Sequence, residues 1–289
     1  MENEIKSEQR VNPENKTWTV DSVREQGSGI MNEDQVLQTD SVCGVFDGAT
    51  SLVPYKAENG DTGGFLASSL VSEYFRTHTE GTLFERACAA NALLKQKMES
   101  RSIDTTQREN LWGTGASVVE VHEDRLEWFQ VNDCSLLFIY EDGSYIQASP
   151  FEDHDTEVLS KWKTLGDKTP KEKSAELRED MVALRRQQNV TYGVMNGDPE
   201  AEKFFRVGSV PREGIKYVLG FTDGGLIPKE NPGEEENFDE CVKVFLAGGL
   251  PALKTFVRER EDSDPDCVKY PRYKTHDDMG AFAITLETA

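Results

Sequence analysis

Two apolar segments of the chain each run into an aspartate that is followed by glycine. The first reads CGVFDG at residues 43–48, and the second reads VLGFTDGG at residues 218–225. One such segment is ordinarily a strand that ends in a turn, because Asp-Gly favours turn geometry. Two of them raise the prospect that Asp47 and Asp223 face each other at the rim of a core. Two ionised carboxylates at such a place are costly unless a cation compensates them.

Two further acidic pairs stand beside apolar segments, Glu33-Asp34 and Asp277-Asp278. No arginine or lysine stands directly beside any of the four clusters. Oxygen ligands without histidine or thiolate select hard cations, here Mg²⁺ or Mn²⁺. A glycine next to an aspartate lets the backbone approach an ion closely, so the carbonyl of Gly48 is a further candidate ligand.

Composition excludes several classes of protein. The 289 residues include 32 basic and 53 acidic side chains, a net charge of −21 that repels a phosphate backbone and argues against nucleic-acid binding. The five cysteines form no C-x-x-C pair, which argues against a disulfide framework and a structural zinc site. The chain has no apolar signal region and no membrane-length apolar run, so we expect a cytoplasmic monomer without a membrane partner.

Hydrophobic periodicity predicts one α+β domain over residues 17–289, preceded by a flexible segment at 1–16. Strands are expected at 17–23, 36–46, 115–122, 125–131, 135–141, 215–222 and 280–287, the three in the middle pairing consecutively as antiparallel neighbours. Helices are expected at 62–78, at 82–100, through much of 155–190 with interruptions at Gly166 and Pro170, and at 238–260 with a break at Gly248–Pro251. Residues 191–212 are expected to form a loop.

The order of five motifs along the chain resembles a known family. NED at 32–34, VFDG at 45–48, VNDCSLLFIY at 131–140, GFTDGG at 220–225 and HDDMGAFAI at 276–284 resemble the metal-dependent protein phosphatases of type 2C, particularly bacterial members. The resemblance extends from about residue 17 to residue 287. It implies a four-layer α/β/β/α sandwich of two mainly antiparallel sheets flanked by helices.

The resemblance also implies the metal ligands. Asp47 would bridge two Mg²⁺ or Mn²⁺ ions, and the carbonyl of Gly48 would bind one of them. Asp223 and Asp277 would hold the other ion. The remaining members of the implied set are Glu33, which would bind through oxygen or water, Asp34, which would support it, and Asp133, which would bind an optional third ion.

The implied activity is metal-dependent hydrolysis of phosphomonoesters, with phosphoserine and phosphothreonine of a phosphorylated protein as substrates. A metal-bridging hydroxide would attack phosphorus directly. No nucleophilic side chain is needed, which agrees with the absence of a C-x5-R sequence. His154, His276 and a metal-bound water all remain open as the source of the proton for the leaving oxygen.

Several positions depart from the family pattern. Family members often carry a phosphate-binding arginine four residues before the glutamate of the first motif, where this chain has Gly29. We expect Arg24 to bind the substrate phosphate instead, with Arg206, Arg212 and the metal ions alone as alternatives. Animal members carry a histidine where this chain has Ala49. The remaining departures are Asn132 and Cys134, which flank Asp133 in place of Gly and Ser, and the unusual segment 191–208.

Three other functions compete with this interpretation. The same fold could serve as a catalytically weak regulatory module that binds a protein partner, since Gly29 and Ala49 remove two polar groups. An enzyme that had lost its activity would normally have lost at least one metal ligand as well, but this chain retains Asp47, Asp223 and Asp277. An aspartyl-phosphate mechanism would require a second carboxylate at position 49, and a structural Ca²⁺ site would require a compact D-x-D-x-D-G loop; the sequence has neither.

Overall fold

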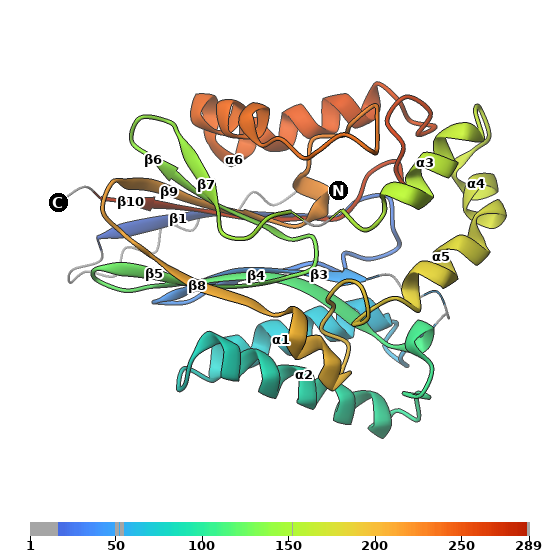
Figure 1. The fold of residues 1–289 in the computed structure, drawn as a ribbon, viewed down its shortest axis with the longest axis horizontal. Coiled ribbons are helices and arrows are strands. Elements are labelled where there is room, and N and C mark those ends of the chain that lie inside the picture. Colours follow the sequence, from blue (N-terminus) through green and yellow to red (C-terminus); the bar gives the residue numbers. More distant parts are fainter. Residues whose placement is uncertain (1–16, 50–51, 53–54, 152, 288–289) are drawn as a thin grey trace.

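Two antiparallel sheets stacked face to face form the centre of the molecule (Figure 1). The computed structural model describes residues 17–49, 52, 55–151 and 153–287, so the expected flexible segment 1–16 lies outside the described residues. The first sheet has the order β1-β10-β9-β6-β7, with strands Trp18–Glu25, Met279–Leu286, Ile215–Phe221, Ser135–Tyr140 and Tyr145–Gln147. The second has the order β2-β3-β4-β5-β8, with strands Gln35–Gln38, Val42–Ala49, Gly113–Val121, Arg125–Val131 and Arg206–Pro211.

Helices cover the outer face of each sheet and complete four layers. The second sheet packs on α1 (Gly63–Thr77) and α2 (Leu83–Ser100), through a core that includes Phe46, Phe75 and Phe129. The first sheet packs on α6 (Asp239–Asp262) through Leu219, Phe245 and Val257 among others. Between the sheets, Val45, Phe138, Phe282 and their neighbours form the central core. The predicted α/β/β/α sandwich is therefore confirmed.

The sequence explains where the helices begin and break. Thr62 and Thr82 cap α1 and α2 through their side chains, and Glu85 completes a capping box at the second. Inside α6, Gly248 and Gly249 leave helical geometry just before Pro251, as expected. None of the helices formed by the described residues combines the length and apolarity needed to cross a membrane.

Three short helices occupy one end of the sandwich, between β7 and β8 in sequence (Figure 1). They are α3 (Thr156–Thr164), α4 (Pro170–Glu176) and α5 (Arg178–Arg185). The side chains of Trp162 and Lys173 both donate hydrogen bonds to the carbonyl of Cys267, each at 3.1 Å. These contacts attach the helices to the loop that precedes β10.

Three predictions, of one strand, one strand pairing and one loop, were wrong in detail. The expected strand 36–46 is two strands, because Thr39 closes a turn by bonding the backbone of Val42. The expected pairing of 125–131 with 135–141 does not occur: β5 pairs with β4 and β8, whereas β6 pairs with β7 and β9 in the other sheet. The expected loop 191–212 ends in β8, a largely exposed edge strand.

Candidate metal centre

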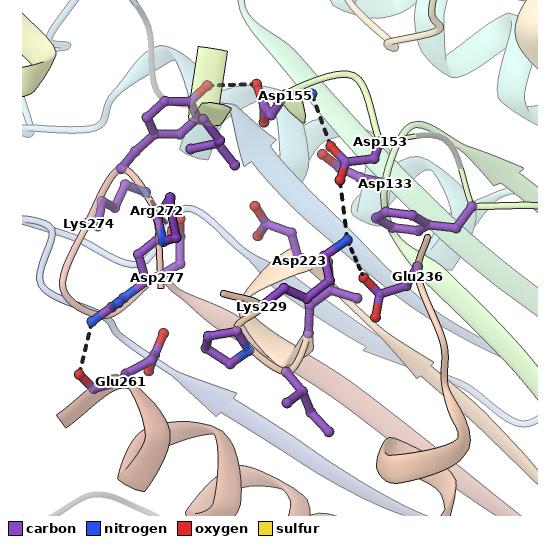
Figure 2. Close-up of a pocket in the computed structure, with 18 of the residues that line it drawn as sticks. Asp133, Asp153, Asp155, Asp223, Lys229, Glu236, Glu261, Arg272, Lys274 and Asp277 are labelled. Carbon is purple, nitrogen blue, oxygen red and sulfur yellow. Dashed lines mark hydrogen bonds and ion pairs between the residues drawn. The ribbon is translucent and has the colours of Figure 1, made fainter. Parts of the chain in front are cut away.

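The predicted acidic residues gather at the end of the sandwich that faces α3–α5. They come from the loop 26–34, the end of β3, the β5–β6 turn, the end of β9 and the loop 271–278 before β10. Asp47, Gly48, Asp133, Asp223 and Asp277 line a common cavity of about 270 Å³ against α5, which we call the α5 cavity. A neighbouring α3 cavity of about 160 Å³ shares Asp133, Asp223 and Asp277 (Figure 2).

Asp278 fixes the loop 26–34 to the start of β10. One carboxylate oxygen accepts the backbone N–H of Gly27, and the other accepts that of Glu33, both at 2.8 Å. From the other side, Arg24 donates to the carbonyls of Asp34 at 2.7 Å and Asn32 at 3.2 Å. Asp278 is thus a buried structural carboxylate that sets the position of Glu33 and Asp34.

This arrangement predicts a graded loss of stability at position 278. Asp278→Ala removes both acceptors and should lower the free energy of unfolding by about 3 kcal/mol, since hydrogen bonds to charged groups contribute about 1.5–3 kcal/mol each. Asp278→Asn keeps one acceptor oxygen and should lose about half as much. Urea unfolding in EDTA measures both, with the exposed Asp124→Ala as control. Equal stability of Asp278→Ala and the wild type would refute this role.

Close packing holds Glu33 at the entrance to β2. The hydroxyl of Thr62 donates to its carboxylate, and Ser68 donates to its carbonyl at 2.5 Å. A side chain at Gly48 would collide with Glu33, because a Cβ there would lie 2.4 Å from the Glu33 carbonyl oxygen. Glycine at position 48 is therefore required by the close approach of two backbones.

Burial and mutual repulsion act on the carboxylates of this cluster. Burial is the largest cause that raises the pKa of Asp34, Asp47 and Asp223 well above the ordinary value, and neighbouring aspartates raise each further. Thr222 partly opposes this at Asp34, donating its hydroxyl at 2.7 Å. Burial also raises the pKa of Asp133, although His154 opposes the shift. Concentrated negative charge of this kind is the environment that a divalent cation stabilises.

Two orphaned oxygens show that the donor set fits hard cations. Among the described residues, Asp47 Oδ2 and Asp133 Oδ1 are buried without a hydrogen-bond partner. Ligand atoms of Asp47, Asp133 and Cys134 lie within 4.8 Å of one another. Burial raises the pKa of the Cys134 thiol well above its usual range, so the thiolate that a soft metal requires is disfavoured. Oxygen ligands remain, as Mg²⁺ and Mn²⁺ prefer.

The two candidate histidines lie in different places. His154 lines both cavities, stacks on Tyr192 with ring centroids 4.2 Å apart, and places Nε2 3.7 Å from Asp133 Oδ2. His276 places Nε2 2.8 Å from Asp262 and lines neither cavity. Of the two, the structure brings only His154 to the centre.

The arginines expected at the phosphate do not line the cavities. Arg24 holds the loop 26–34 as described above, Arg206 lies on β8, and Arg212 donates to the carbonyl of Thr17 at 2.6 Å. Four basic side chains that the sequence did not predict line the cavities instead, and two of them, Lys229 and Arg272, line the α3 cavity alone. Arg185 lines the α5 cavity, and Lys274 lines both cavities.

Lys274 is paired with a predicted metal ligand. Its Nζ donates to Asp277 Oδ1 at 2.6 Å, and both residues belong to the loop 271–278, with Asp223 beside them (Figure 2). Burial works to lower the pKa of Lys274, but the charges of Asp277, Asp223 and Asp278 outweigh it and hold that pKa above its usual range. A lysine three residues before the Asp-Asp pair was the one sequence signal available for it.

Solved structures share this fold across nearly the whole chain. The Mycobacterium tuberculosis serine/threonine phosphatase PstP/Ppp is 15% identical, with a TM-score of 0.57 over 94% of this chain and 99% of that one. Staphylococcus aureus Stp1 is 14% identical, with a TM-score of 0.56 over 93% and 95%. The PstP catalytic domain in complex with two manganese ions is 13% identical, with a TM-score of 0.54 over 94% and 99%.

A comparison with curated proteins finds no match. The family model described as Protein phosphatase 2C matches residues 24–245, which span every predicted ligand except Asp277. Together with the sandwich and its acidic end, this match settles the family. The chain belongs to the protein phosphatase 2C family and is a protein phosphatase of type 2C.

Proposed function

We propose that the chain removes phosphate from phosphoserine and phosphothreonine of proteins, using Mg²⁺ or Mn²⁺ held at the acidic end of the sandwich. The observation that supports this most is a pair of buried oxygens, on Asp47 and Asp133, that have no hydrogen-bond partner among the described residues. Both aspartates line one cavity together with Asp223 and Asp277. The structure of PstP with two manganese ions supports the choice of cation.

Each residue of the centre would have a distinct role. Asp47 would hold two ions at once, and the carbonyl of Gly48 would hold one of them. Asp223 and Asp277 would bind the other ion, Glu33 and Asp34 would complete the set, and Asp133 would hold a third. When bound, two cations activate a water molecule and neutralise the phosphoryl oxygens. This chain's residues would fix the charge and spacing that such chemistry needs, and His154, which lines both cavities, would exchange a proton with the leaving oxygen.

The proposed substrate is tested by phosphate release from phosphoserine and phosphothreonine peptides in Mn²⁺ and in Mg²⁺. Turnover of the peptides supports a protein phosphatase with the proposed specificity. The catalytically weak module is the rival, favoured by Gly29 and by Ala49, which lines the α5 cavity without a polar group. It predicts peptide binding without phosphate release under both cations.

Asp223→Asn should lose less activity than a change at Asp47, because Asp223 is assigned to a single ion. We expect kcat/KM to fall about 100-fold, at the lower end of the range for the loss of one electrostatic contact in an active site. Raised Mn²⁺ should recover part of the loss, since the defect is one of cation affinity. A Mn²⁺ titration of the initial rate measures this. A deficit that is identical at every Mn²⁺ concentration would contradict the assignment.

A further inference from the structure

We propose that Lys274 binds the phosphate group of the substrate, in place of the arginine that related phosphatases carry where this chain has Gly29. The proposal rests on the proposed phosphatase function and names the residue that gives the enzyme ground-state affinity for the substrate phosphate. Position 29 itself supplies no side chain. A Cβ built there would meet only the carbonyl oxygen of Met31, at 3.5 Å, so the space beside the loop is open.

The position of Lys274 is the first argument. Its side chain lines the α3 and α5 cavities, and both of these contain Asp223 and Asp277. An ammonium group has three N–H donors. Within the described part of the chain, the hydrogen bond to Asp277 Oδ1 is the one that the structure gives for Nζ. The other donors are available to a phosphate in either cavity while the contact with Asp277 is kept.

The other cations nearby are the second argument. Arg272 bonds the carboxylate of Asp264 and four backbone carbonyls within residues 261–275. Lys229 pairs with Asp153 and Glu236 on the far side of the α3 cavity (Figure 2). Each of these two cations has several protein acceptors, whereas the one acceptor described for Lys274 is Asp277.

Arg185 differs from Lys274 in the carboxylates that it faces. Its charge acts on Asp133, Tyr192 and Tyr273, on the α5 side of the centre. Lys274 instead bonds Asp277 and lines both cavities with Asp223, and these two aspartates are the ligands assigned to one of the two ions that would contact the phosphoryl oxygens. The flexible stem of a lysine also suits a contact that must follow a moving phosphoryl group. The geometry therefore favours Lys274 over Arg185 for the phosphate.

Kinetics of Lys274→Met on an aryl phosphate test the proposal, at a divalent-cation concentration that saturates each variant. A contact made equally in the ground and transition states changes KM and leaves kcat nearly constant. We expect KM to rise at least about tenfold, which is the loss of one charge-assisted hydrogen bond, with kcat within about threefold of the wild type. Lys274→Arg keeps the charge and should restore KM to within about threefold. Lys269→Met, five residues earlier in the segment between α6 and β10 and paired with Glu230, is the matched control and should behave as the wild type.

Calorimetry of inorganic phosphate binding to the cation-loaded proteins gives a second readout that needs no turnover. Its affinity should fall in Lys274→Met by the same factor as KM rises. Unchanged KM and phosphate affinity would overturn the proposal. So would a KM defect that disappears at higher cation concentration, since Lys274 would then act only by positioning Asp277. If the wild type shows no turnover at all, the proposed function fails, while the calorimetric comparison still tests Lys274.

Discussion

Asp47→Asn is expected to lower kcat/KM about a thousandfold, equivalent to about 4 kcal/mol of transition-state stabilisation. Asp47 is the one side chain assigned to both ions, so the substitution weakens two cation contacts at once. It also removes the buried Oδ2 charge that has no partner among the described residues. Initial rates on an aryl phosphate across a Mn²⁺ titration measure the effect.

The variant should remain folded, which separates a catalytic defect from unfolding. Burial and the charges of Asp34 and Asp133 disfavour the ionised form of Asp47, as its raised pKa indicates. Removing that charge relieves repulsion, so the thermal midpoint in EDTA should equal or exceed that of the wild type. Wild-type rates in a folded Asp47→Asn would reject the bridging assignment, and Asp124→Asn, an exposed change of the same chemistry, serves as the control.

The helices and most strands could be predicted because their signals are local. The 62–78 and 82–100 predictions agree with α1 and α2 to within a residue, since threonine caps mark where each helix begins. The strand 125–131 was placed correctly and its pairing with the strand 115–122 is confirmed, but its expected pairing with 135–141 was wrong. Asn132 adopts a left-handed φ of 66° and the chain then crosses to the other sheet, where Cys134 accepts hydrogen bonds from Ser117 and Gln130. Such a crossing depends on tertiary contacts that periodicity does not record.

Strand β8 was missed for a different reason. It is an edge strand whose side chains are mostly exposed, so Arg206–Pro211 lacks the apolar alternation that identifies a buried strand. Gly208 packs under the ring of Trp128, where a Cβ would lie 2.4 Å from the ring. That contact is made with β5, far away in sequence, and only the folded chain displays it.

The acidic residues of the site could be predicted, but the cations around them could not. Asp47 and Asp223 could be identified because each stands at the end of an apolar segment and is followed by glycine. Which of His154 and His276 lies at the site depends on the path of the loops that carry them. The role of Arg24 also depends on a loop path, because its guanidinium bonds the backbone carbonyls of Asn32 and Asp34. Lys274 stands three residues before Asp277 in the sequence, but that it lines both cavities depends on the path of the loop 271–278.

Removal of divalent cations should have the largest effect of all, because the proposed mechanism assigns the attack on phosphorus to a cation-activated water and not to a side chain. Within the described residues, the α5 cavity brings carboxylates, His154 and two basic groups to the substrate, and Cys134 is held as a buried thiol. An uncompensated cluster of aspartates would also repel a phosphate dianion. Activity in excess EDTA is therefore expected to fall below about a thousandth of the cation-loaded rate.

The most direct test of this account is hydrolysis of an aryl phosphate by the purified protein in excess EDTA and after readdition of Mn²⁺ or Mg²⁺. The wild type should be inactive in EDTA and recover fully on readdition of at least one of the two cations, while Asp47→Asn should stay nearly inactive in both conditions. Circular dichroism in EDTA checks that the protein remains folded throughout. Robust hydrolysis by the folded wild type in excess EDTA would contradict the proposal that the acidic end of the sandwich is a metal-dependent catalytic centre.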